Sequence, residues 1–220
     1  MPGSLLLVFA VAPIAVAALC LSVRRPRLSE AANRIAAGIA FLAAAPLPFF
    51  AGDTPALFWN DYVVLDRVAA WVIFCTATVY LLASIYAIGY MRMMDEERRL
   101  FRFYALFAAF GFTTLIGPMM NNIGLYWIAI ELTTLVSTFL VAFERVAESM
   151  EAAWKYIMVV SAGISLALLG TVLFYWCGTF VLGPTYAMTW GALIAAAPRM
   201  SGSLVTLAFV LVLVGYGTKV

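Results

Sequence analysis

The stretch Asn121–Arg145 reads NNIGLYWIAIELTTLVSTFLVAFER, and its apolar part indicates the class of fold. From Ile123 to Phe143 it supplies about 20 mostly apolar residues, the length of helix that spans the hydrocarbon core of a bilayer. Glu131 interrupts this run. At about 1.5 Å per residue, its carboxylate is expected roughly 12 Å inside a hydrocarbon core that is about 30 Å thick.

An acid at this depth costs about 2.5 to 3.5 kcal/mol on insertion scales, so a partner, water or a bundle interior normally keeps it there. Helical spacing places four further residues on the face of Glu131, namely Gly124, Trp127, Thr134 and Thr138. This semi-polar stripe favours a functional site, with Thr134 and Thr138 as a polar relay. The alternative interpretation is an acid that is protonated, or hydrogen-bonded to hydroxyls, within ordinary helix packing.

The composition of the whole chain agrees with a membrane location. Hydrophobic residues make up 65% of the sequence and charged residues 11%, against about 25% charged in an average soluble domain. We therefore predict an all-α polytopic membrane protein that is part of a larger bundle. Nucleic acid is excluded as a plausible partner, whereas the lipid bilayer is an expected one.

The sequence offers no ligand set for a redox cofactor or a metal. It has no histidine, and its three cysteines, Cys20, Cys75 and Cys177, stand singly in apolar segments without a CxxC motif. We expect no cofactor, no metal and no catalytic residue, and interpret all three thiols as buried structural groups. In any redox reaction, partner proteins would carry the cofactors.

About seven apolar runs are expected to cross the membrane. The sixth contains a stripe of small residues (Gly163, Ala167 and Gly170) of the kind that lets membrane helices approach closely. The connection after it is expected at the membrane interface, with a short helix. The expected spans are Ser4–Val23, Ile35–Ala51, Val68–Met91, Phe103–Met120, Ile123–Phe143, Ala152–Trp176 and a run from about Leu204.

These spans are expected to form one membrane domain, residues 1–220, in which 1–102 holds the first three spans and their loops. The last run reaches Val220 without a flanking charge, turn or cap. A terminal carboxylate there would be unpaired in or near hydrocarbon, which is unfavourable. We therefore expect these residues to be the front part of a longer protein.

Basic residues outside the spans predict the orientation in the membrane. One side holds only Arg67 and Arg199. This bias predicts a multi-pass protein of the cell inner (plasma) membrane with its N-terminus outside. The other, cytoplasmic side holds Arg24, Arg25, Arg27, Arg34, Arg92, Arg98, Arg99, Arg102, Arg145 and Lys155.

The sequence has only two lysines, Lys219 and Lys155, and each lies within an apolar run of the second half. Lys219, in LVLVGYGTKV, is expected about 22 Å from the start of its run, unless the helix begins outside the core or breaks near Gly215 and Gly217. The alternative is a lysine that extends from a helix end to the membrane surface. For Lys155, at the start of the sixth run, this second interpretation is favoured.

Three segments resemble one known family. They read NNIGLYWIAIELTTLVSTFLVAF, EAAWKYIMVVSAGISLALLGTVLFYW and LAFVLVLVGYGTKV. In this order they are similar to the antiporter-like membrane subunits of complex I and of membrane-bound hydrogenases, closest to the component F type subunits of hydrogenase-4 and formate hydrogenlyase. The resemblance covers roughly residues 60 to 220 and is specific in three positions: Glu in span five, AAxKY opening span six, and GxGTK in span seven.

The resemblance implies a fold and a site. The family has about fourteen spans that include two inverted repeats, so 103–220 would hold most of the first repeat. Its proton-translocating residues fall on Glu131, Lys219 and Lys155. It implies a non-catalytic subunit of an oxidoreductase complex, with other membrane and peripheral subunits as partners and protons, or Na⁺, as the transported ion.

Two rival functions are open at this point. One is a subunit of a cation/proton antiporter, which would differ in its neighbouring subunits and its Na⁺ dependence. The other is a structural membrane anchor without transport, which would tolerate the neutralisation of both Glu131 and Lys219.

The predicted orientation can be tested by labelling single cysteines in intact cells. We expect an impermeant maleimide to label Asn60→Cys from outside and to leave Arg98→Cys unlabelled, because the basic loops face the cytoplasm. The three native cysteines are replaced by alanine beforehand. Outside labelling at position 98 with none at position 60 would falsify the topology.

Overall fold

The computed structural model describes residues 2–52, 54–93 and 99–219, so Arg98 lies outside the described residues. Within this part of the chain, six helices are long and apolar enough to cross a membrane, which confirms the predicted helical membrane fold. The chain divides into two compact units. Unit 1 comprises Met1–Phe58 with Val64–Met119, and unit 2 comprises Trp59–Val63 with Met120–Val220.

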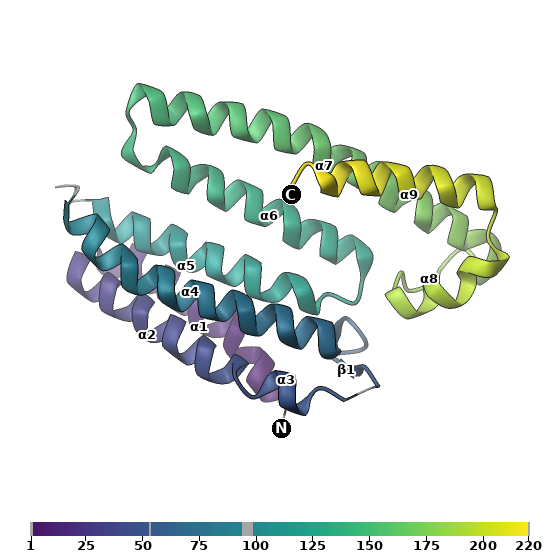
Figure 1. The fold of residues 1–220 in the computed structure, drawn as a ribbon, viewed down its shortest axis with the longest axis horizontal. Coiled ribbons are helices and arrows are strands. Elements are labelled where there is room, and N and C mark those ends of the chain that lie inside the picture. The colour runs from purple at the N-terminus through teal and green to yellow at the C-terminus, as the bar shows by residue number, and fades with distance from the viewer. Residues whose placement is uncertain (1, 53, 94–98, 220) are drawn as a thin grey trace. The chain divides into compact units, whose positions relative to one another are not determined.

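Unit 1 is a bundle in which α1 packs against α2 and α5, and α2 packs against α4 (Figure 1). Alanines on one face of α2, among them Ala36, Ala37 and Ala40, are buried and allow this close packing. The elements of the unit are α1 (Pro2–Val23), α2 (Pro26–Ala44), α3 (Leu47–Phe50), α4 (Arg67–Met93), α5 (Leu100–Ile116) and the 3-10 turn η2 (Gly117–Met119).

A buried polar cluster joins α2 to α4 inside unit 1. The amide of Asn33 is fully buried, and its Nδ2 donates to Ser84 Oγ at 3.1 Å. The Tyr80 hydroxyl in turn donates to Asn33 Oδ1 at 2.8 Å. Each partner satisfies a polar group that would be costly to leave unpaired away from water. The cluster therefore fixes the register of the two helices.

The basic ends of α2 and α4 lie at the same end of unit 1, because Arg92 Nη2 and Glu30 Oε1 form an ion pair at 3.0 Å. This geometry agrees with the prediction that the first and third loops share one side of the membrane. Which side they face stays a prediction.

A short hairpin follows α3. Strands β1 (Ala56–Phe58) and β2 (Val63–Leu65) pair in a two-stranded sheet. Its turn holds Trp59, Asn60 and Asp61 at φ values of 52°, 54° and 65°, in the left-handed region that asparagine and aspartate tolerate better than other side chains.

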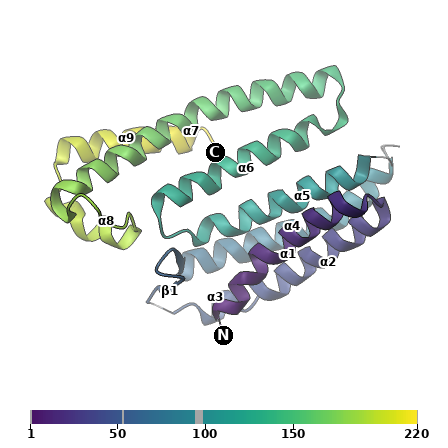
Figure 2. The same ribbon diagram turned by 180° about the vertical axis from the view of Figure 1, so that it is seen from behind.

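Unit 2 is built around the long helix α7 (Ala147–Leu182), with α6 (Ile123–Val141) and α9 (Gly202–Gly217) packed against it (Figures 1 and 2). The 3-10 turn η3 (Ala142–Glu144) follows α6, while α8 (Trp190–Ala196) and η4 (Ala197–Arg199) form the expected short helical connection. At 36 residues, or about 54 Å, α7 is longer than the predicted span.

The difference in length has a physical reason at each end of α7. At the start, α7 also includes the acidic segment that precedes the apolar run, and at the other end it stops before Gly183, whose φ is 95°.

Helix α9 is short. It has 16 residues, or about 24 Å, which is less than the thickness of a hydrocarbon core.

Hydrogen bonds from two asparagine side chains and from the backbone hold the start of α6 in place. The side chain of Asn122 caps the helix by accepting from the amides of Gly124 and Leu125 at 3.0 and 3.1 Å. Asn121 Nδ2 donates to the carbonyl of Asp61 at 2.7 Å, and the Trp190 amide donates to the carbonyl of Asn121 at 3.1 Å. Three separate segments of unit 2 thus meet where the central stretch begins.

The predicted stripe of small residues on α7 is confirmed as the contact with α9. A Cβ added to Gly170 would lie 2.7 Å from the carbonyl oxygen of Ala208, and one added to Gly215 would lie 2.7 Å from the Cα of Ala167. A Cβ on Gly163 would overlap the side chain of Thr218. The two backbones therefore approach too closely for larger residues.

We expect Gly215→Ala to lower the melting temperature of the purified protein in detergent. The new Cβ meets backbone atoms of Ala167 that cannot move aside, and overpacking of this kind typically costs about 1 to 3 kcal/mol. Gly217→Ala is the matched control, because a Cβ there meets nothing within 4 Å. Equal melting temperatures for the two variants would contradict the packing described here.

Candidate functional site

Glu131 lies within α6 and its side chain is partly exposed. Its atom Oε2 is buried and has no hydrogen-bond partner in the part of the chain that the structure describes. One turn earlier, Trp127 Nε1 donates to the carbonyl of Ile164 on α7 at 2.9 Å. This bond fixes α6 against the middle of α7, so it sets the level at which the carboxylate lies.

The two threonines predicted as a relay lie beside Glu131 and are buried. Thr134 is fully buried and Thr138 is 9% exposed. The Thr138 hydroxyl donates to the carbonyl of Thr134 at 2.8 Å, and the Thr134 hydroxyl donates to the carbonyl of Ile130 at 3.4 Å. Both hydroxyls therefore use their protons on their own helix and present their lone pairs to other groups.

Lys219 follows the end of α9 and is half-buried. Its Nζ donates to Thr133 Oγ1 on α6 at 3.2 Å. The preceding residue, Thr218, packs on Gly163, which lies near the midpoint of α7. The close contact between α7 and α9 thus brings the lysine back to the middle of unit 2, where Glu131 also lies.

The structure brings Lys219 against α6 at the level of Glu131. The hydrogen bond of the lysine nevertheless runs to Thr133, which the predicted stripe did not include. Sequence spacing places Thr133 on a different face of α6 from Glu131, so a stripe drawn around Glu131 omits it. A search for hydroxyls within two residues of a buried acid would have found it.

Lys155 lies away from this pair, near the start of α7. It is exposed and forms an ion pair with Glu151, one turn earlier on the same helix. This geometry fits the interpretation that Lys155 reaches the membrane surface.

The sequence analysis missed the neighbouring residue Tyr156, whose hydroxyl shares a hydrogen bond of 3.0 Å with Ser137 on α6.

The prediction that all three thiols are buried is wrong for one of them. Cys20 and Cys177 are buried, but Cys75 is exposed on α4. The sequence could not separate these cases, because the lipid-facing side of a membrane helix is as apolar as its packed side. Within the described ranges, no group of three or more His, Cys, Asp or Glu residues could hold a metal ion.

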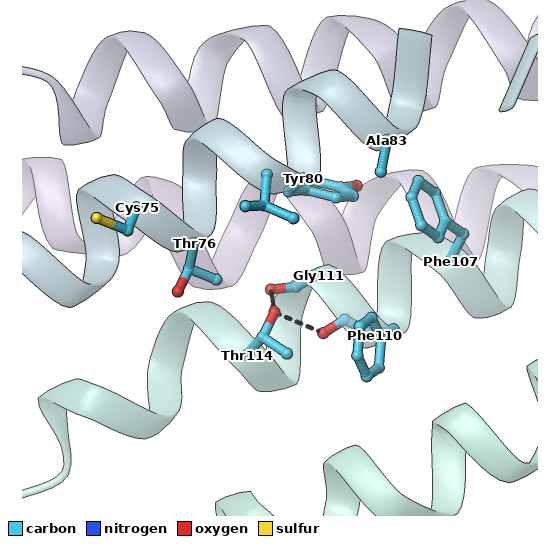
Figure 3. Close-up of a pocket in the computed structure, with 9 residues that line it drawn as sticks. Cys75, Thr76, Tyr80, Ala83, Phe107, Phe110, Gly111 and Thr114 are labelled. Atoms are coloured by element: carbon cyan, nitrogen blue, oxygen red, sulfur yellow. Dashed lines mark hydrogen bonds between the residues drawn. The ribbon is translucent and has the colours of Figure 1, made fainter. Parts of the chain in front are cut away.

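Cys75 lines a groove of about 300 Å³ between α4 and α5 in unit 1 (Figure 3). The Tyr80 ring packs against Gly111, where an added Cβ would lie 2.7 Å from the ring. The Thr114 hydroxyl donates to the carbonyls of Phe110 and Gly111 at 3.0 and 3.1 Å. The hydroxyls of Tyr80 and Thr114 are thus used within the unit, and the groove offers a mainly apolar surface.

The fold is that of a multi-pass helical membrane protein, and it is similar to that of chains from respiratory membrane complexes. Two solved structures share this fold. The chain aligns with a chain of the membrane-bound sulfane sulfur reductase, an archaeal respiratory membrane complex, at a TM-score of 0.82 and 17% identity, covering 96% of this chain and 44% of that one. It aligns with a chain of respiratory complex I from Thermus thermophilus at a TM-score of 0.68 and 26% identity, covering 97% and 43%.

Among curated proteins, the chain is similar to a hydrogenase-4 component F homolog from Methylacidiphilum infernorum (isolate V4). The two are 42% identical over 121 residues, which are 54% of this chain and 25% of the relative. The chain thus spans about a quarter of that protein's length. No family model matches the chain. The resemblance predicted from the sequence is confirmed by these relatives.

Proposed function

We propose that the chain is part of a proton-translocating, antiporter-like membrane subunit of a redox-driven complex of the hydrogenase-4, formate hydrogenlyase or complex I type. The observation that carries the proposal is the position of Lys219 beside α6, at the level of Glu131, whose Oε2 is buried. Charged groups inside the membrane part of a protein are costly and commonly mark ion pathways. The similarity to hydrogenase-4 component F supports the same function.

In this proposal, Glu131 and Lys219 act as a gate for protons. Desolvation disfavours the charged form of a buried lysine, and a nearby carboxylate favours it. When the two side chains approach each other, the lysine holds its proton. When they separate, the lysine releases it. A conformational change in the complex that alters their spacing would therefore move one proton at a time past this point.

A relay is needed between this gate and the membrane surface. Thr134 and Thr138 lie on the face of Glu131 and can serve, together with water, as a path along α6. Lys155, exposed near the start of α7, would act at the surface end of the path rather than at the gate. We expect its contribution to be smaller for this reason.

The setting of the subunit follows from the same proposal. Other membrane and peripheral subunits would supply the redox cofactors, and the inner membrane would hold the complex with the N-terminus of this chain outside. The region 103–220 would contribute most of the first antiporter-like repeat within a single membrane domain. The transported ion would be the proton, with Na⁺ as the alternative to be tested.

We expect Glu131→Gln and Lys219→Ala each to reduce proton translocation strongly in the full-length subunit assembled with its partners. Glu131→Gln keeps the side-chain volume, Lys219→Ala shortens a half-buried side chain just after the end of α9, and each removes a charge that is costly to bury. Assembly and electron transfer to artificial acceptors should therefore largely survive. The double variant should be little worse than either single one, because coupled groups are not additive. Lys155→Ala should be milder.

The measurement is substrate-driven formation of a pH gradient in membrane vesicles, normalised to the amount of assembled complex. Wild-type gradients in both single variants would sink the gate and favour the structural anchor. A gradient that requires Na⁺ in the wild-type protein, and that persists without the redox substrate when a Na⁺ gradient is imposed, would favour the cation/proton antiporter.

A further inference from the structure

The hydroxyl of Thr133 is oriented to accept a hydrogen bond from Lys219. Its own proton is committed to the carbonyl of Ile130, because Thr133 Oγ1 donates to that oxygen at 2.6 Å. Only its lone pairs are left for other partners. The ammonium of Lys219, which has donors and no acceptor, lies 3.2 Å away and matches this arrangement.

Thr133 and Glu131 project from nearly opposite sides of α6. With 3.6 residues per turn, a separation of two residues rotates the side chain by about 200° and moves it about 3 Å along the axis. The two acceptors are therefore at almost the same level but on different faces of the helix. Close contact of the lysine with one acceptor takes it away from the other.

Both acceptors are strong enough to hold the lysine. Lys219 is half-buried, so its ammonium has lost part of its water and gains from each hydrogen bond that replaces it. A hydrogen bond with an ionised partner is roughly twice as strong as a neutral one. The four-carbon stem of lysine is flexible and allows the head group to change partner.

We propose that Thr133 is a positioning residue that provides a second resting place for the ammonium of Lys219, in competition with Glu131. In the conformation seen here, Thr133 holds the lysine and Glu131 Oε2 is without a hydrogen-bond partner. The inference rests on the proposed function, since it explains how Lys219 is kept away from Glu131 between two encounters of the pair. Without this second acceptor, the lysine would stay with Glu131 and release its proton less readily.

The test compares Thr133→Val, which keeps the shape and removes the hydroxyl, with Thr133→Ser, which keeps the hydroxyl. A hydrogen bond to a charged group is worth enough to change the partition of the lysine by roughly tenfold or more. We therefore expect Thr133→Val to lower substrate-driven proton translocation severalfold in the assembled complex. The Thr133→Ser variant should translocate protons at about the wild-type rate. Thr78→Val is the matched control, because the Thr78 hydroxyl likewise donates to the carbonyl one turn earlier on its own helix.

A double-mutant cycle on the melting temperature tests the contact independently of transport. Thr133→Val should lower the melting temperature of the wild-type protein but not of the Lys219→Ala variant, because the two residues share one interaction. Additive effects of the two changes would overturn the inference. So would wild-type translocation in Thr133→Val, or a failure of Thr133→Ser to restore it.

These outcomes separate the inference from the function on which it rests. If Lys219→Ala abolishes translocation while Thr133→Val leaves it intact, the role of Thr133 is wrong and the gate stands. If Lys219→Ala pumps normally, the gate itself is wrong, and the coupling between Thr133 and Lys219 in the melting temperature then reports a packing contact only.

Discussion

The burial of opposite charges in an apolar bundle is the constraint on which the second half of the chain depends. An acid in the middle of a membrane helix is costly, and so is a lysine at the same level. The structure brings Lys219 against α6 at the level of Glu131 and gives the lysine a hydroxyl partner on Thr133. In the part of the chain that the structure describes, no ion pair joins Glu131 to Lys219. That arrangement suits groups that change partner during a reaction.

The close packing of α7 and α9 makes this arrangement possible. Only small residues let the two backbones approach, and Gly170 and Gly215 each meet backbone atoms of the opposite helix. The same contact seats Thr218 on Gly163 and thereby fixes the level of Lys219 along α7. The small residues that let α7 and α9 pack closely therefore also determine where the ammonium of Lys219 lies. The hydrogen bonds of Asn121 to Asp61 and Trp190 likewise fix the position of the start of α6.

Patterns that depend on one helix were predictable from the sequence. Hydropathy identified the spans, and spacing gave the polar face of Glu131 and the small face of α7. Contacts between helices were harder to predict. The sequence did not reveal that Lys219 binds Thr133, or that Tyr156 meets Ser137. It also misjudged Cys75, because in a membrane protein both faces of a helix are apolar and periodicity does not tell which one is covered.

The central claim is that Lys219 takes up and releases a proton as its spacing from the Glu131 carboxylate changes. Infrared difference spectroscopy on the assembled full-length complex tests it most directly, by following the carboxylate band of Glu131, which shifts when the ammonium approaches or withdraws during turnover. The account predicts a band that changes when substrate is added, that is missing in Glu131→Gln and that is altered in Lys219→Ala. A complex that pumps protons while the Glu131 band stays constant would contradict the account.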